Sequence, residues 1–300
     1  MELNNKYNDL YLHKLHQDIL TIMDEVDRVC KANHLRYYLM AGSCLGAVRH
    51  HGFIPWDDDM DIAMPRADFE RFISLTSGIS NDGIHALDER FYLRWVTTDK
   101  YYNHAFAKVC LKGTVFQESN GPSARNAGIY IDVFPLDSCD SYSRKIERQN
   151  RMFISLGQLL RYKGAGPKLN WKLKGLVKKV LTTLFSVNTI HKVMLRVINP
   201  TDENKTDYQV FYGTPYPIQR MIFPKEWHGE GRRMAFEDRY YVCPSEAELC
   251  LKRIYGDNYM QIPPENKRKS HYPLRVVFSD GEEMLFEETK EKVKYKDLLD

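Results

Sequence analysis

Four aspartates stand within five positions of one short segment: Asp57, Asp58, Asp59 and Asp61. Two carboxylates about 4 Å apart repel each other by roughly 1 kcal/mol in water and by about 4 kcal/mol at an effective dielectric constant near 20. A hard divalent cation removes this repulsion, and Mg²⁺ binds one or two protein carboxylates together with water and substrate phosphates. The segment therefore predicts a metal site, with a solvated acidic turn as the alternative interpretation.

The spacing of these aspartates fits a strand. Side chains alternate along a strand, so Asp57, Asp59 and Asp61 would project to one face and the apolar residues at 60, 62 and 64 to the other. The apolar face would anchor the strand while the carboxylates converge. This alternation favours the metal site over the acidic turn.

A second acidic position follows in the segment 128–137, GIYIDVFPLD. Asp132 stands inside an otherwise apolar strand pattern, where a lone carboxylate is costly unless it is paired or coordinating. We expect Asp132 to be a third metal ligand or a general base, and the alternative is a partner for a buried arginine. Asp137 follows a proline and is expected in a turn.

A phosphate site is predicted next to these acids. Residues 36–41 indicate a strand that ends in a Gly42-Ser43 turn, whose backbone N–H groups would face a phosphate. Arg49 and Lys108 would add positive charge. The chain has no Walker A sequence, no GxGxxG and no GxSxG, which argues against P-loop, Rossmann and serine-hydrolase classes.

The elements that must position these residues are read from periodicity and turn residues. Apolar spacings of three and four predict a long amphipathic helix at the start of the chain, and short β-branched and aromatic runs predict strands after it. The mixture predicts an α/β (α+β) fold with a mixed sheet flanked by helices. We expect helices over 12–35, 45–49, 65–75 and 245–255, strands over 36–41, 60–64, 91–96, 104–110 and 129–134, and mostly helix over 141–200.

A basic helical insertion separates two parts of the predicted fold. Residues 161–200 contain nine Lys or Arg and no Asp or Glu, beside an apolar stripe. This pattern is typical of a helix on an anionic membrane surface, and an ordinary packed helix with a solvated basic face is the alternative. We expect a catalytic core over 1–140, the insertion over 141–200, and a part over 201–300 that completes the catalytic domain and its acceptor side, with a charged tail at its end.

Composition excludes several classes. The chain has 300 residues with 43% hydrophobic and 28% charged residues, which indicates a globular protein. A net charge of +3 is too small to indicate a nucleic-acid partner. Six cysteines without a CxxC pair indicate buried thiols instead of zinc or disulfides. With no secretory signal and no apolar run of 18 residues, we expect a cytoplasmic protein, at most peripheral at the membrane face through 161–200.

The quoted motifs resemble the LicD family. The block GSCLGAVRHHGFIPWDDDMDIAMPRADFERF, within residues 38–72, is similar to the family signature, and FAKVCLKGT, IYIDVFPLD and residues 234–259 extend the similarity over most of the chain. The resemblance implies a nucleotidyltransferase-like fold. It also implies transfer of phosphocholine from CDP-choline to sugars of cell-surface glycans, whereas fukutin-like relatives transfer ribitol phosphate from CDP-ribitol.

The resemblance also assigns roles. It implies metal binding by Asp59 and Asp61 with support from Asp57, a catalytic role for Asp132, and nucleotide phosphates facing Gly42 and Ser43. One departure affects a local loop, because a glycine often follows the Phe-Glu pair of the family whereas Asp238 stands here.

These observations together predict a phosphotransferase that uses Mg²⁺ or Mn²⁺ and a CDP-linked donor, with CDP-choline favoured. The acceptor would be a sugar hydroxyl of a glycan or of a lipid-linked sugar, as in teichoic acid, lipopolysaccharide or capsule. Two alternatives remain open: a nucleotidyltransferase that uses a nucleoside triphosphate, and a non-catalytic scaffold that binds membranes or glycans. For the choline group, cation–π contact would come from Trp56, Trp95, Tyr101 or Tyr102, unless these rings only pack in the core.

Overall fold

The structure is a computed structural model, in which α1 alone covers 31 residues. It describes residues 2–78, 86–99, 102, 104–118, 127–161, 180, 183–185, 187–198, 205–214, 216–268, 270 and 273–286, with only the backbone for 2–9, 158–161, 187 and 188. Most of the predicted basic arm, the charged tail and Tyr101 lie outside this part of the chain. Of the helices described, none combines the length and the apolar composition needed to cross a bilayer.

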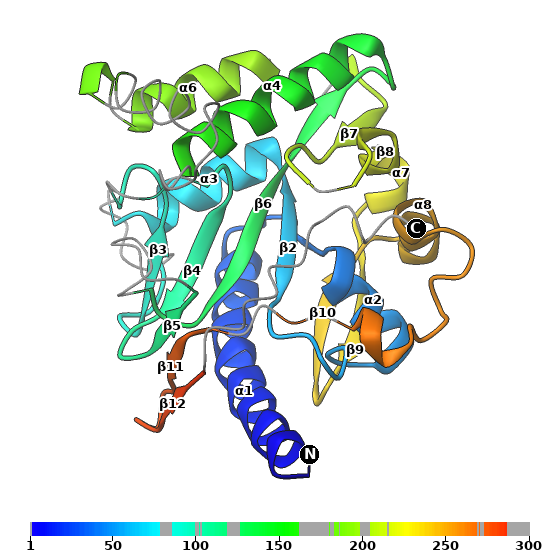
Figure 1. Ribbon diagram of the computed structural model, residues 1–300. Helices are drawn as coiled ribbons and strands as arrows, with labels where there is room; N and C mark the ends of the chain where they lie inside the picture. The colour runs from blue at the N-terminus through cyan, green and yellow to red at the C-terminus, as the bar shows by residue number, and fades with distance from the viewer. Residues whose placement is uncertain are drawn as a thin grey trace, which may run out of the picture.

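A mixed sheet forms the centre of the described chain, which confirms the predicted α/β class (Figure 1). Its strand order is β1-β2-β6-β4-β3, and β7 and β8 extend it from the far end of β6. Strands β2 and β6 run parallel, and the other pairs are antiparallel. The strands are β1 (Tyr38–Leu39), β2 (Asp61–Pro65), β3 (Phe91–Arg94), β4 (Ala107–Leu111), β6 (Tyr130–Cys139), β7 (Tyr208–Val210) and β8 (Ile222–Pro224).

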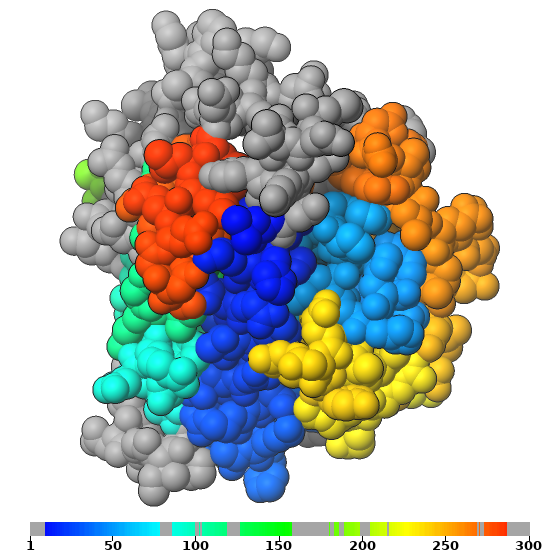
Figure 2. Space-filling model, turned by 90° about the horizontal axis from the view of Figure 1, so that it is seen from below, coloured from blue at the N-terminus to red at the C-terminus, as the bar shows by residue number. Residues whose placement is uncertain are grey.

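Helix α1 (Glu2–Ala32) covers one face of this sheet and packs against β4 and β6. The apolar residues that predicted it, from Leu12 to Cys30, are all buried. Figure 2 shows α1 between two small β elements at the surface. On one side lies the hairpin β9 (Arg232–Phe236) and β10 (Arg239–Cys243), and on the other lie β11 (Arg275–Val277) and β12 (Glu283–Leu285), which pair with β5 (Val115–Gln117).

Helix α2 (Ala41–His50) begins earlier than the sequence predicts. Strand β1 ends at Leu39, and Ala41 adopts a positive φ of 46° that redirects the chain into the helix. Gly42 and Ser43 therefore form the first turn of α2, and the expectation of a turn before a helix at 45–49 is wrong. Helix α2 packs on α8 (Ala247–Tyr255) and β9.

Helix α3 (Arg66–Thr76) packs against β2, β3 and β6, and its Phe69 and Phe72 lie in the same core as the buried residues of α1. Helices α4 (Arg144–Arg161) and α6 (Val187–Ile198) belong to a second core. The described part of 141–200 is mostly helical, as predicted. Helices α4 and α6 pack on each other, and their apolar residues share one core with Leu136 of β6 and Val210 of β7. Shorter elements are η2 (Ile218–Met221), α7 (Lys225–His228) and η3 (Glu265–Lys267). All six cysteines are buried and free, as expected.

Candidate functional site

A cleft of about 870 Å³ opens along β2 and β6. Its walls come from the first turn of α2, the loop before β2, the start of α3, the helices α4, α6 and α8, and the segments 104–106, 211–216 and 258–263. The volume is within the range of small-molecule sites. Apart from Ser43, every residue predicted to bind a metal or a phosphate lines this cleft.

Three of the four clustered aspartates face the cleft: Asp57, Asp59 and Asp61. Asp58 points away, is 2% exposed, and accepts a hydrogen bond of 3.3 Å from the Tyr11 hydroxyl. The strand predicted over 60–64 is confirmed within one residue at each end, but of these acids only Asp61 belongs to it, so strand alternation does not place Asp57 and Asp59. The carboxylates converge because the preceding loop and the strand end open into the same cleft.

Asp57 is the most crowded of these acids. Burial, and then the neighbouring Asp59, Asp58 and Asp61 carboxylates, raise its pKa well above the usual range. Gly42 packs directly against it, because a Cβ at that position would lie 2.9 Å from Asp57 Oδ2. The first turn of α2 and the acidic loop are thus in contact.

Asp132 lies beside Asp61 in the parallel register of β2 and β6. On its other side Lys108 of β4 is its register partner, with Lys108 Nζ 3.2 Å from Asp132 Oδ1. Burial raises the pKa of Asp132, and the Lys108 ammonium opposes this shift. The ammonium also lies 3.1 Å from the centre of the Tyr130 ring. The buried partner of Asp132 is therefore a lysine, where the alternative interpretation expected an arginine.

Gly42 and Ser43 have different positions. Gly42 lines the cleft at the N-terminal end of α2, whose N-cap makes no side-chain hydrogen bond. The Ser43 hydroxyl accepts a hydrogen bond of 2.8 Å from the backbone N–H of Asp61, and Ser43 is absent from the cleft wall. Ser43 holds the start of β2 in place, so the structure brings only Gly42 of this pair to the cleft.

Arg49 reaches the rim of the cleft from the last turn of α2. Its Nη1 donates hydrogen bonds to the carbonyl oxygens of Tyr259 (3.0 Å) and Gln261 (3.1 Å). The guanidinium thus holds the rim segment 258–263 against α2. Part of its hydrogen-bonding capacity is used there, although the side chain still lines the cleft.

Sequence reasoning missed one charged pair in the cleft, Arg66 and Asp137. Asp137 lies inside β6 and is 1% exposed, so the expectation of a turn residue is wrong. Its two carboxylate oxygens accept hydrogen bonds from Arg66 Nε (2.7 Å) and Nη2 (2.9 Å). The sequence offered an arginine at the start of the helix predicted over 65–75 and an aspartate five residues after Asp132. It carried no signal that the two side chains pair.

Of the aromatic residues proposed for choline that the structure describes, only Trp56 lines the cleft. Trp56 lines it, with the Arg268 guanidinium 4.6 Å from its ring centre. Trp95 and Tyr102 are buried and do not line the cleft. The rings that do face it include two contacting sets, Tyr216 with Tyr255 at 5.7 Å, and Phe106, Phe134 and Phe211 with successive centroid distances of 4.4 and 4.7 Å.

The donor set of the cleft fits a hard cation. Carboxylates that raise the pKa of a neighbour as they do at Asp57 would be stabilised by a bound positive charge. Among the described residues, no three His, Cys, Asp or Glu side chains are placed as a ready ligand set. One or two protein carboxylates, with water and substrate oxygens completing the shell, is the coordination that Mg²⁺ commonly adopts.

Fold and cleft define an α/β protein with a cluster of acidic side chains in a cleft along two neighbouring parallel strands. Residues 34–151, which contain all of these acids, match the family described as LicD/FKTN/FKRP, nucleotidyltransferase domain. The resemblance to the LicD family that the motifs indicate is confirmed over these residues.

Curated relatives agree with this assignment. The chain is 25% identical over 258 residues to a lipopolysaccharide cholinephosphotransferase LicD of Haemophilus influenzae, covering 84% of this chain and 92% of that protein. It is also 31% identical over 72 residues to an uncharacterized protein of Rickettsia typhi, covering 24% of this chain and 23% of that protein.

Proposed function

We propose that this protein transfers phosphocholine from CDP-choline to a sugar hydroxyl of a cell-surface glycan. The observation that carries the proposal is the convergence of Asp57, Asp59, Asp61 and Asp132 in one cleft of a LicD-family domain. Similarity to the Haemophilus cholinephosphotransferase over most of both chains supports phosphocholine as the group transferred.

Mg²⁺ is the proposed cofactor, and Asp59 and Asp61 are the residues that would hold it, with Asp57 in support. When bound there, the ion would neutralise the negative charge of the donor diphosphate and of the departing CMP. The uncapped N-terminus of α2 at Gly42 adds a positive dipole end on the same side of the cleft.

Asp132 is the proposed general base. A new bond forms between the sugar oxygen and the phosphorus nearer choline, the bond from that phosphorus to the CMP oxygen breaks, and the hydroxyl proton passes to Asp132. Burial moves the pKa of this carboxyl upward, toward the range in which a base accepts a proton well at neutral pH. Lys108 keeps the carboxyl ionised before the transfer and supplies positive charge beside it.

The aromatic walls support a choline-bearing donor. A quaternary ammonium gains roughly 0.5 to 2 kcal/mol from each aromatic face that it contacts. Tyr216 and Tyr255 lie near the acid cluster, since the Asp57 and Asp61 carboxylates act on the pKa values of both phenols. A choline group bound there would lie within the field of these carboxylates.

Product analysis tests the proposal. The wild-type protein with CDP-choline, Mg²⁺ and a glycan acceptor is expected to release CMP, and Asp59→Ala is expected to lower the rate by about 10²–10³-fold. Asp58→Asn is the matched control, because this neighbouring acid points away from the cleft and its loss should leave CMP release unchanged.

Three results would contradict the proposal. Release of diphosphate from a nucleoside triphosphate would indicate nucleotidyl transfer instead. CMP release by folded Asp59→Ala at the wild-type rate would remove the proposed metal ligand. Failure of CDP-choline with Mg²⁺ to raise the melting temperature of the wild-type protein, at a concentration far above an ordinary dissociation constant, would speak against the donor.

A further inference from the structure

Arg66 has hydrogen-bonding capacity in the cleft that no part of the proposed reaction uses. A guanidinium carries five N–H donors in a planar fork, and Arg66 uses two of them, on its Nε–Nη2 edge, to bind Asp137. Within the described residues, the donors of Nη1 have no recorded partner. The outer edge, formed by Nη1 and the second N–H of Nη2, is therefore open for another bidentate acceptor.

The guanidinium of Arg66 is held in a fixed orientation. Asp137 is almost fully buried and accepts two short hydrogen bonds from the Nε–Nη2 edge of the guanidinium. The centre of the Phe69 ring lies 5.4 Å from the guanidinium carbon. The Arg66 side chain is 12% exposed and lines the cleft. A planar fork held in this way loses little side-chain entropy when it binds a phosphate.

The two other cations of the cleft wall are engaged differently. Arg49 donates to the carbonyl oxygens of the rim, and Lys108 is paired with Asp132 and lies over Tyr130. Helix α3 also begins at Arg66, and its N-cap makes no side-chain hydrogen bond. The positive end of an 11-residue helix therefore lies next to the guanidinium.

Arg66 is distant from the acid cluster. Asp61 and Asp132 are register partners, Asp137 follows five residues after Asp132 on β6, and Arg66 is the first residue after the end of β2. At 3.3 Å per residue, five residues of strand span about 16 Å, more than the length of a diphosphate. An anion on Arg66 is therefore a different group from the one at Asp59 and Asp61.

We propose that Arg66, positioned by Asp137, is a second anion-binding site of the cleft that takes a phosphate group carried by the acceptor. Naming the acceptor as the source rests on the proposed function, whereas phosphate binding at Arg66 does not. The cleft is also lined by the apolar side chains of Phe153 from α4 and Met194 from α6, which suit the less polar parts of a large acceptor.

Inorganic phosphate is the probe, titrated calorimetrically into the full-length protein at saturating CMP. Wild type is expected to bind phosphate under these conditions, and Arg66→Gln to bind it at least tenfold more weakly. Arg66→Lys, which keeps the charge and loses the fork, should be intermediate and serves if Arg66→Gln does not fold. The control is Arg36→Gln, which breaks an ion pair to Asp68 on the same helix α3 outside the cleft.

Three outcomes would overturn the proposal. Unchanged phosphate affinity in both folded Arg66 variants would remove the site. No phosphate binding by wild type would do the same. Displacement of phosphate by CMP in wild type would assign Arg66 to the donor nucleotide. The proposed function fails separately, through absence of CMP release from CDP-choline, so the two failures are distinguishable.

Discussion

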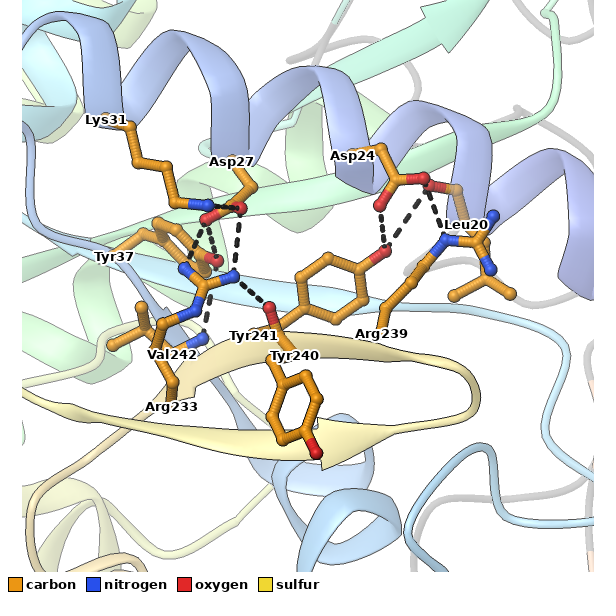
Figure 3. A network of polar contacts seen from close by, with 10 residues as sticks. All are labelled: Leu20, Asp24, Asp27, Lys31, Tyr37, Arg233, Arg239, Tyr240, Tyr241 and Val242. Carbon is orange, nitrogen blue, oxygen red and sulfur yellow. Dashed lines mark hydrogen bonds and ion pairs between the residues drawn. The ribbon is translucent and has the colours of Figure 1, made fainter.

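Asp27 and Asp57 lie in two regions of one molecule where aspartates have opposite surroundings. Asp27 belongs to the α1 clasp, by which we mean the contact of α1 with the β9–β10 hairpin (Figure 3). Asp57 belongs to the cleft. Burial raises the pKa of both, but in the clasp the bonds from Arg233, Lys31 and Tyr37 outweigh it and hold the pKa of Asp27 below its usual range. At Asp57 the neighbouring carboxylates raise the pKa further, in the same direction as burial.

The clasp gives each acid its own donors. Asp27 accepts from the Tyr37 hydroxyl at 2.7 Å and from Arg233 Nη1 at 2.9 Å. Asp24 accepts from the Tyr241 hydroxyl at 2.7 Å and from Arg239 Nε at 2.8 Å. Paired acids of this kind stabilise a fold, while crowded acids weaken it, so the cleft acids indicate a ligand-binding role.

The largest effect is expected from Asp61→Asn in the cleft. The substitution removes one proposed metal ligand and should lower CMP release from CDP-choline by about 10³-fold, or about 4 kcal/mol in the activation barrier. The free energy of unfolding should not fall, because the variant removes repulsion. If the folded variant keeps more than a tenth of the wild-type rate, the cleft acids do not have the ligand-binding role that distinguishes them from the acids of the clasp.

The next effect is expected from Asp27→Ala in the clasp. Arg233 and Tyr37 lose their acceptor, and the free energy of unfolding should fall by about 2 kcal/mol in urea titrations, with CMP release by the folded protein unchanged. Asp24→Ala, whose carboxylate is 47% exposed, should cost less. Equal losses for both variants would show that burial does not determine the energy of these pairs.

Asp57→Asn should raise stability at neutral pH in metal-free buffer, on the order of 1 kcal/mol. The folded-state pKa of Asp57 lies above its unfolded value, so ionisation destabilises the folded protein as pH rises past that value. Below about pH 4 both states are protonated, and the gain of the variant should vanish. Melting temperatures measured between pH 3.5 and 8 check this, and a gain independent of pH would point to packing instead.

The smallest effect is expected from Lys31→Ala. Lys31 pairs with Asp27 one turn away on α1 and is 60% exposed, so its contribution is about 0.5 kcal/mol or less. Urea titrations at low and high salt measure it. A loss comparable to that of Asp27→Ala would show that the lysine, and not Arg233 with Tyr37, keeps the carboxylate ionised.

Local pattern was enough to predict most elements and the cleft acids. The helix α1 and strands β2, β4 and β6 follow from apolar spacing, and Asp132 was found because a carboxylate interrupts an apolar run. The start of α2 was missed because Ala41 adopts a positive φ, which alanine rarely does and which no local residue type signals.

Contacts between side chains that are far apart in the sequence could not be predicted from it. Arg66 and Asp137 are separated by 71 positions, and only the parallel pairing of β2 with β6 brings them together. The Tyr216–Tyr255 contact and the Arg49 hydrogen bonds to residues 259 and 261 depend in the same way on tertiary contacts. Side chains whose role depends on a distant partner carry no signal in periodicity or composition.

Strand β6 carries Asp132 and Asp137 on one continuous 10-residue segment that is hydrogen-bonded to β2, β4 and β7. Such a strand cannot lengthen or shorten, so the backbone would fix the separation between the hydroxyl that reacts at Asp132 and the phosphate proposed to bind Arg66. The protein would then select acceptors by the distance between their phosphate and the hydroxyl that reacts. A glycan whose phosphate is one sugar too close to the hydroxyl, or one too far from it, would fill only one of the two positions.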